Sequence, residues 1–209
     1  MATPTDAPLP PRPPDETDTE LAAPNSLRGA VLRDGTVTDA DLSDHTLTEG
    51  RLSDLRLVRG SLANADLSRC EVRRVELTGT RSTGSSFAEA TVADVAFVEC
   101  RLDLASFRFA TLERVAFRDC RLEEAYFYGA TLSSVLFERC PLVGATLSEA
   151  TLDRVELRGC DLEALKGAER LRGARMPWAD IVASAGTFAA TLGIVVSDDL
   201  EPIVKQVSD

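Results

Sequence analysis

Large apolar side chains recur at every fifth residue from Leu27 to Leu162. Of the 28 positions in this register, 27 hold Leu, Val or Phe, and Ser82 is the exception. The residue two places before each of these centres is usually small, as Ala90 and Ala110 are, and the other three positions are mostly polar. A period of five matches neither the 3.6-residue period of a helix nor the two-residue period of a strand.

This period requires the chain to turn a corner once in every group of five residues. In an unbroken strand, residues five apart would point to opposite faces of a sheet. A corner in each group returns every large side chain to the inside, and the small residue two places earlier shares that inward face. The pattern therefore predicts short sides arranged around one common interior.

A second period, of twenty residues, sets the number of sides in one turn. From residue 85 to residue 164, like residues recur twenty positions apart. Because each side has five residues, a period of twenty means that four sides make one coil. We therefore predict an all-β solenoid, a β-helix of about seven four-sided coils, with coils about 4.8 Å apart and a rod about 34 Å long. The columns that carry this prediction include Cys100, Cys120, Cys140 and Cys160, and also Phe87, Phe107 and Phe127.

One coil departs from the pattern, where a serine replaces an apolar centre. The segment Thr80–Ser85 is polar throughout and contains Gly84. We expect a bulge or a loosened corner around Ser82, because its side chain cannot fill the interior as Leu or Phe does.

The two ends of the chain differ in composition from the rod, which we place at residues 25–165. Residues 1–24 hold seven of the ten prolines and more acids than bases, and predict a disordered acidic tail. Residues 166–196 contain Pro177, an apolar stripe at helical spacing and Gly193, which predicts a C-terminal α-helix. Residues 197–209 form a second acidic tail.

The predicted C-terminal helix has two uses that the sequence leaves open. It can cover the last coil, because solenoid ends expose unpaired backbone and need caps. It can also pair two chains as a homodimer, and the two uses are compatible. The candidate dimer residues are Trp178, Ile181, Val182, Phe188 and Leu192.

Repeats such as Ala110-Thr111-Leu112-Glu113-Arg114 and Cys120-Arg121-Leu122-Glu123-Glu124 resemble those of the pentapeptide-repeat protein family. The resemblance covers about residues 25–165 and implies a right-handed quadrilateral β-helix. Most members of the family have no assigned role. The best-understood branch, the quinolone-resistance and topoisomerase-protecting proteins, comprises acidic rods, often dimeric through a C-terminal helix, that resemble a DNA duplex to gyrase.

The residue inventory argues against an enzyme and against a cofactor or metal site. Inward cysteines in a straight row do not converge as zinc requires, so we expect buried, unreactive thiols. The only histidine, His45, has no partner set for a nucleophilic triad, and no glycine-rich phosphate loop is present. We therefore predict no catalytic, metal-binding or cofactor-binding residue.

Charge and hydropathy limit the partners and the compartment. The net charge of −11 disfavours direct binding of nucleic acid, whose phosphates need Lys and Arg. No apolar stretch is long enough to span a membrane, and the first residues lack the pattern of a signal peptide. We expect a cytoplasmic protein with a protein partner.

Three aromatic residues break the polar pattern of the outward positions: Phe109, Tyr126 and Tyr128. Exposed aromatics clustered on one coil can form a binding surface. They can equally be cross-strand stacking that stiffens the rod. The sequence leaves these two interpretations open.

Two functions remain. The first is a noncatalytic protein-interaction module or scaffold built on a rigid rod. The second is a DNA mimic that binds a type II topoisomerase, DNA gyrase, and confers protection from quinolone-like inhibitors. Residues 25–165 hold 23 acids but also 17 bases. A DNA mimic needs continuous negative potential, so the mixture of signs favours the first function.

Overall fold

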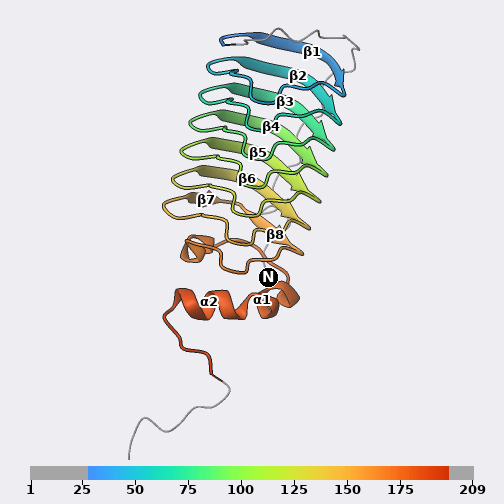
Figure 1. The fold of residues 1–209 in the computed structure, drawn as a ribbon. Helices are drawn as coiled ribbons and strands as arrows, with labels where there is room; N and C mark the ends of the chain where they lie inside the picture. The colour runs from blue at the N-terminus through green and yellow to red at the C-terminus, as the bar shows by residue number, and fades with distance from the viewer. Residues whose placement is uncertain (1–27, 198–209) are drawn as a thin grey trace, which may run out of the picture.

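The computed structural model describes residues 28–197 and contains a parallel β-solenoid closed at one end by helices (Figure 1). The tails predicted at 1–24 and 197–209 lie outside the described residues, Ser197 excepted. Successive coils stack along one axis, and six of them carry an eight-residue strand. The strands are β1 (Val31–Thr38), β2 (Arg51–Val58), β3 (Glu71–Thr78), β4 (Thr91–Val98), β5 (Thr111–Arg118), β6 (Thr131–Glu138), β7 (Thr151–Asp153) and β8 (Glu156–Arg158).

The pairing register advances by twenty residues at every step, which confirms the predicted four-sided coil. Leu52 pairs with Val72, and Val72 pairs with Val92, in parallel ladders. Six such steps lead from β1 to β7, and the sides after β8 add a further partial turn. Each long strand forms two sides of the coil, whereas isolated bridges such as Ser106 to Tyr126 form the other two.

The corners lie two residues after each apolar centre, and their backbone adopts the left-handed conformation. Phe109 has φ 55°, Arg114 has φ 54° and Asp119 has φ 53°, so the conformation does not depend on glycine. Left-handed φ is costly for residues with a Cβ. The backbone bonds of the stack offset this cost, as when the Phe109 N–H donates to the Tyr128 carbonyl at 3.0 Å.

Aromatic side chains fill the interior of the central coils in two regular stacks. Within each stack the ring centroids lie 4.9–5.0 Å apart and the rings are nearly parallel. Between the stacks the rings meet edge to face, a favourable arrangement for aromatic pairs. One stack contains Phe87, Phe107 and Phe127, and the other contains Phe97, Phe117 and Phe137.

The prediction of a bulge around Ser82 is wrong, because this coil keeps the regular geometry. Arg81 bridges Arg101 at the usual spacing of twenty, and the Ser82 N–H donates to the Arg101 carbonyl at 2.7 Å. The Ser85 hydroxyl donates to the Ser82 carbonyl at 2.8 Å. The backbone ladder thus holds the coil, and the defect is confined to the side chain: the Ser82 hydroxyl is buried without a hydrogen-bond partner among the described residues.

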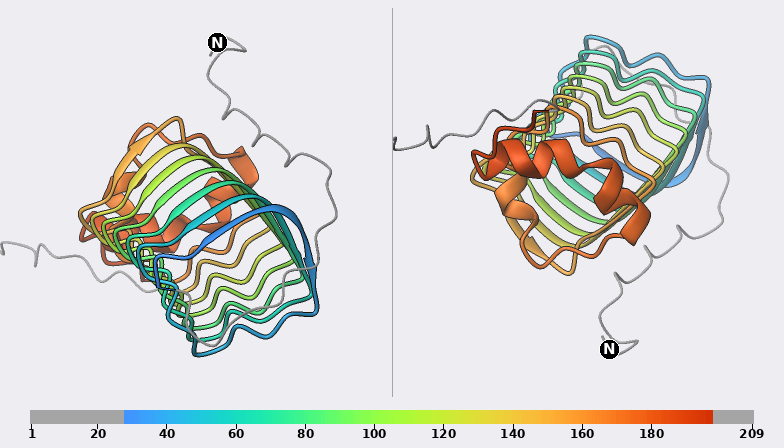
Figure 2. Two further views of the ribbon diagram at one scale, coloured as in Figure 1. Left: turned by 90° about the horizontal axis from the view of Figure 1, so that it is seen from above. Right: turned by 90° about the horizontal axis from the view of Figure 1, so that it is seen from below.

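The helical segment expected over the last coil forms two short α-helices, α1 (Trp178–Ala183) and α2 (Ala185–Thr191), instead of one. They follow a 3₁₀ helix, η2 (Ala168–Leu171), and lie across the open end of the solenoid (Figure 2). The buried Ser184 separates α1 from α2, with φ −93° and ψ 9°. The register slips by one residue here, since Glu156 bridges Arg175 instead of a residue twenty positions away.

Candidate functional site

One side of the rod carries nearly all of its exposed large apolar side chains. Its outward positions are joined by bridges from Asp66 to Ser86, Ser106, Tyr126 and Thr146. We call this side the aromatic face. Its outward residues are Asp66, Ser68, Ser86, Ala88, Ser106, Arg108, Tyr126, Tyr128, Thr146 and Ser148, and the corners Leu104 and Phe109 border it.

The structure places the three aromatic residues predicted as an interaction surface on this face, in two neighbouring coils. Phe109, Tyr126 and Tyr128 are 52%, 43% and 36% exposed. Phe109 and Tyr128 contact each other edge to face with ring centroids 5.6 Å apart. Tyr126 has no ring contact with either among the described residues and stands as a separate exposed ring on the same side.

Arg108 and Gly129 hold the Phe109–Tyr128 pair in place. The guanidinium carbon of Arg108 lies 5.6 Å from the Phe109 centroid and 6.0 Å from the Tyr128 centroid, within the range of a cation–π contact. The Phe109 ring lies over Gly129, where a Cβ would come within 2.5 Å of two ring carbons. Gly129 therefore provides the space that this aromatic corner occupies.

Sequence reasoning missed Leu104, which is 48% exposed at the corner on the other border of the face. Leu104 is two residues after a centre, a position that the five-residue pattern treats as polar, so its apolar character is the signal that could have found it. The face is also poor in charge, since Asp66 and Arg108 are the only ionisable groups other than tyrosine among its ten outward residues. An apolar, weakly charged strip of this kind is typical of protein-binding surfaces.

The other sides and corners of the rod differ because many of their acids are paired with arginines. Arg74 donates to Asp54 with a contact of 2.7 Å, and Arg139 donates to Asp119 at 2.6 and 2.8 Å. The Arg74 guanidinium lowers the pKa of the Asp54 carboxyl below its usual range. Bonds between residues twenty apart thus join adjacent coils and place opposite charges side by side in the corner columns that contain Asp54 and Asp119.

The residues predicted as a dimer helix separate into two sets. Phe188 is partly buried and packs against the core, and Ile181 is half-buried, so these two serve the cap. Trp178, Val182 and Leu192 are exposed at 79%, 57% and 75%. The outer surface of α1 and α2 therefore presents three large apolar side chains away from the rod.

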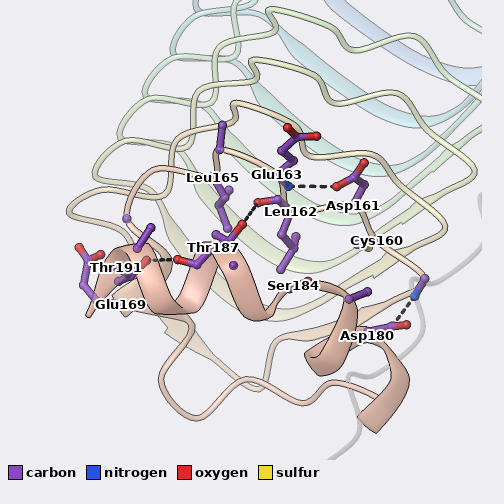
Figure 3. Close-up of a pocket in the computed structure, with 16 residues that line it drawn as sticks. Cys160, Asp161, Leu162, Glu163, Leu165, Glu169, Asp180, Ser184, Thr187 and Thr191 are labelled. Carbon is purple, nitrogen blue, oxygen red and sulfur yellow. Dashed lines mark hydrogen bonds between the residues drawn. The ribbon is translucent and has the colours of Figure 1, made fainter. Parts of the chain in front are cut away.

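A groove of about 1120 Å³ separates the last coil from the cap helices (Figure 3). Asp180 and Thr187 reach across it: the Gly159 N–H donates to Asp180 Oδ2 at 2.6 Å, and Thr187 Oγ1 donates to the Leu162 carbonyl at 2.9 Å. The N–H of Leu162 forms no hydrogen bond within residues 28–197. The side chains of the cap thus replace only part of the bonding that another coil would supply.

The cysteine column ends at this groove, and its last thiol, Cys160, is a poor nucleophile. Each Sγ from Cys100 to Cys160 contacts a backbone carbonyl of the preceding coil, at 3.3–3.5 Å. Burial raises the pKa of the Cys160 thiol to about 12, so the thiol stays protonated at neutral pH. His45 lies in an early coil, where its Nδ1 contacts the Ser43 carbonyl at 2.7 Å. These two residue types therefore form no thiol–imidazole pair in the described chain.

No group of three or more His, Cys, Asp or Glu residues suited to a metal ion is found among residues 28–197. Over the same range, no helix has the length and apolarity that crossing a membrane requires.

Comparisons with known proteins identify the repeats. The family model described as pentapeptide repeat region matches residues 82–147 and 110–168. No curated protein matches the chain. Solved structures that are similar to it include HetL, a pentapeptide repeat protein involved in heterocyst differentiation regulation from the cyanobacterium Nostoc sp. strain PCC 7120, with 25% identity, a TM-score of 0.38, and 73% of this chain and 85% of HetL covered.

Two further structures extend this set. A trypsin-treated variant of QnrB1, a plasmid-mediated fluoroquinolone resistance protein, has 18% identity and a TM-score of 0.38, with 84% of this chain and 94% of QnrB1 covered. A pentapeptide repeat protein from the Arabidopsis thaliana thylakoid lumen has 21% identity and a TM-score of 0.29, with 60% and 70% covered.

Proposed function

Because this chain is a pentapeptide-repeat protein, we propose that it is a noncatalytic rod that binds a protein partner through the aromatic face. The observation that supports this function is the gathering of Leu104, Phe109, Tyr126 and Tyr128 on one weakly charged side of two neighbouring coils. Aromatic side chains at the centre of an interface commonly contribute most of its binding free energy. The regular stack of coils fixes the backbone that carries these side chains, so little backbone entropy is lost on binding.

The aromatic face can be tested with a double variant that keeps the fold. In Tyr126→Ser and Tyr128→Ser, each tyrosine takes the residue found at the equivalent position of a neighbouring coil, Ser106 and Ser148. We expect a partner that copurifies with the wild type from an extract of the source cell to be lost with this variant. A control variant on another side, Thr111→Ser and Thr131→Ser, should retain it. Equal recovery by all three proteins would overturn the proposal.

The charge distribution favours this function over a gyrase-binding DNA mimic. Arginines that pair with Asp39, Asp54, Asp94 and Asp119 interrupt the negative potential along the corners of the rod. A supercoiling assay with purified gyrase and a quinolone separates the two functions. We expect neither inhibition nor protection at micromolar protein, and protection would establish the mimic instead.

We also propose that the outer surface of α1 and α2 joins two copies of the chain. Trp178 and Val182 in α1 and Leu192 at the end of α2 support this, because a group of exposed apolar side chains is typical of an interface. The substitution Trp178→Asp should convert a dimer to a monomer in light scattering without unfolding the cap. A monomeric wild type would contradict this proposal.

The five cysteines favour the cytoplasm as the site of action. All five are buried and unpaired by disulfides, as expected for a protein of a reducing compartment.

A further inference from the structure

We propose that the aromatic face binds the proline-rich segment of the chain's own N-terminal region, residues 7–14. This inference rests on the proposed function, since it assigns a first occupant to the same surface. The segment reads Ala7-Pro8-Leu9-Pro10-Pro11-Arg12-Pro13-Pro14. Bound in this way, it would cover the surface until a protein partner displaces it.

The exposed side chains of the face suit a proline-rich strand. Such sequences favour the extended polyproline II helix, and protein surfaces lined by exposed aromatic rings bind them because the helix loses little entropy. Tyr126 and Tyr128 point outward from one short side, about 7 Å apart along the chain. With Leu104 at one border and Phe109 at the other, the apolar strip runs across the whole width of the face.

The charges on the face match those of the segment. Glu124 is exposed at the corner beside Tyr126, and its carboxylate forms no ion pair or hydrogen bond with a described residue. The Arg108 guanidinium lies over the two aromatic rings and likewise forms no ion pair with an acid among residues 28–197. Arg12, the only basic residue of residues 1–24, complements Glu124, and the acids that follow at 15 and 16 complement Arg108.

The distance between the two charged positions on the face agrees with the distance between the opposite charges in the segment. Positions 124 and 128 lie about 13 Å apart along the side, and Arg108 stacks against Tyr128. In a polyproline II helix, Asp15 and Glu16 follow Arg12 by about 9 and 12 Å. Both contacts can therefore form at once with the segment running across the face.

The start of the described chain places the segment within reach. Arg28 lies eighty residues before Arg108, so it occupies the same side of the rod four coils away. Four coils correspond to about 19 Å. The thirteen residues from 15 to 27 can extend up to about 43 Å, so the segment reaches the aromatic face with slack to spare.

The chain contains two tyrosines, both on this face, and a single tryptophan, on the cap. Fluorine NMR of the full chain labelled with 3-fluorotyrosine therefore reports on the aromatic face alone. We expect both resonances to move when Pro10, Pro11 and Pro13 are changed together to Ala, and a synthetic peptide of residues 5–20 to return them. Pro4→Ala with Pro24→Ala, which leaves the run intact, is the matched control and should change neither resonance.

A charge exchange tests the orientation. Arg12→Glu should shift the tyrosine resonances as the proline variant does, and adding Glu124→Arg should restore the wild-type spectrum. Tyrosine resonances that are identical in the wild type and in the proline variant would overturn the proposal. A shift of the Trp178 indole N–H resonance in a separate spectrum of ¹⁵N-labelled protein, with the tyrosine resonances unchanged, would assign the segment to the cap and equally overturn the proposal.

The outcome is separable from that of the proposed function. If the tyrosine resonances do not respond while the copurifying partner still depends on Tyr126 and Tyr128, the face binds a partner but not the tail. If the segment binds, the proline variant should recover more partner than the wild type, because the surface is then uncovered.

Discussion

The coils of the rod and the cap at its C-terminal end satisfy the same backbone in two different ways. In the rod, each coil forms a regular set of backbone hydrogen bonds with the next. The Leu142 N–H donates to the Asp161 carbonyl, for example, as the equivalent N–H of every earlier coil does to the coil that follows it. At the end, the backbone of Arg175 still pairs with β8, but elsewhere single side chains from Asp180 and Thr187 take the place of a coil, and a groove is left between the coil and the cap. Repetition thus gives nearly the same set of bonds in every coil, whereas a cap of unrelated structure supplies only some of them.

The largest effect on the free energy of unfolding is expected for a phenylalanine of the rod, and a phenylalanine of the cap serves as the comparison. Phe117 lies between Phe97 and Phe137 at 4.9 and 5.0 Å, with no exposed surface, so Phe117→Ala should lower the free energy of unfolding by about 3–5 kcal/mol. Phe188→Ala, in a partly buried site, should cost less than half as much. Chemical denaturation of both variants measures the difference, and equal costs would break the comparison.

The next effect concerns two glycines after the last full coil, both at left-handed φ. A Cβ at Gly167 would lie 2.4 Å from the backbone nitrogen of Ser148, so Gly167→Ala must displace η2 from the coil and should cost about 2–3 kcal/mol. Gly173 has nothing within 4 Å of the same position. Gly173→Ala should cost only about 1 kcal/mol, from backbone strain. Melting temperatures of the pair test whether this junction packs as closely as the rod.

A stabilising change should come from the one polar centre of the rod. Ser82→Leu restores the residue found twenty positions away on either side, Leu62 and Leu102, and removes a buried hydroxyl without a partner among the described residues. Burial of the larger side chain should raise the free energy of unfolding by about 1.5 kcal/mol. The measurement is again chemical denaturation, with Ser82→Ala to separate the loss of the hydroxyl from the gain of volume. A destabilised Ser82→Leu would mean that the coil has closed around the serine.

The smallest effect concerns one bond of the cap. Thr187→Val keeps the shape of the side chain but removes the donor to the Leu162 carbonyl, at a cost of about 1 kcal/mol. Amide hydrogen exchange in α2 should become faster, while exchange in β4–β6 stays unchanged, because each coil depends mainly on its neighbours. Faster exchange throughout the rod would show that the cap controls the stability of every coil.

The interior and the coil geometry could be predicted from the sequence, because the apolar side chains of Leu112, Phe117 and Leu122 repeat wherever the backbone repeats. The end could not. Nothing in the apolar stripe of residues 177–192 marks Ser184 as the break between α1 and α2, since that break follows from packing onto a unique last coil. The regular coil at Ser82 also escaped prediction, because backbone bonds from neighbouring coils outweigh one missing side chain.

The candidate face was predicted in part. Phe109, Tyr126 and Tyr128 stand out as aromatics at polar positions, but Leu104 was overlooked because a single leucine does not disturb the composition of the rod. Corner residues such as Leu104 and Phe109 combine a left-handed backbone with an outward side chain. The structure is needed to show which of these corner residues project from the same side of the rod.

Because the register is a uniform twenty residues, a whole coil can be deleted or duplicated without disturbing the coils around it. Removal of one whole lap, such as residues 91–110, would leave Ala90 followed by Thr111 and keep every remaining ladder in step. Duplication of a lap would lengthen the molecule by about 4.8 Å without a new kind of contact. A gene encoding such a chain can therefore change the reach of its product by copying or losing the codons of one lap, while any insertion of another size would turn every later side to a new direction.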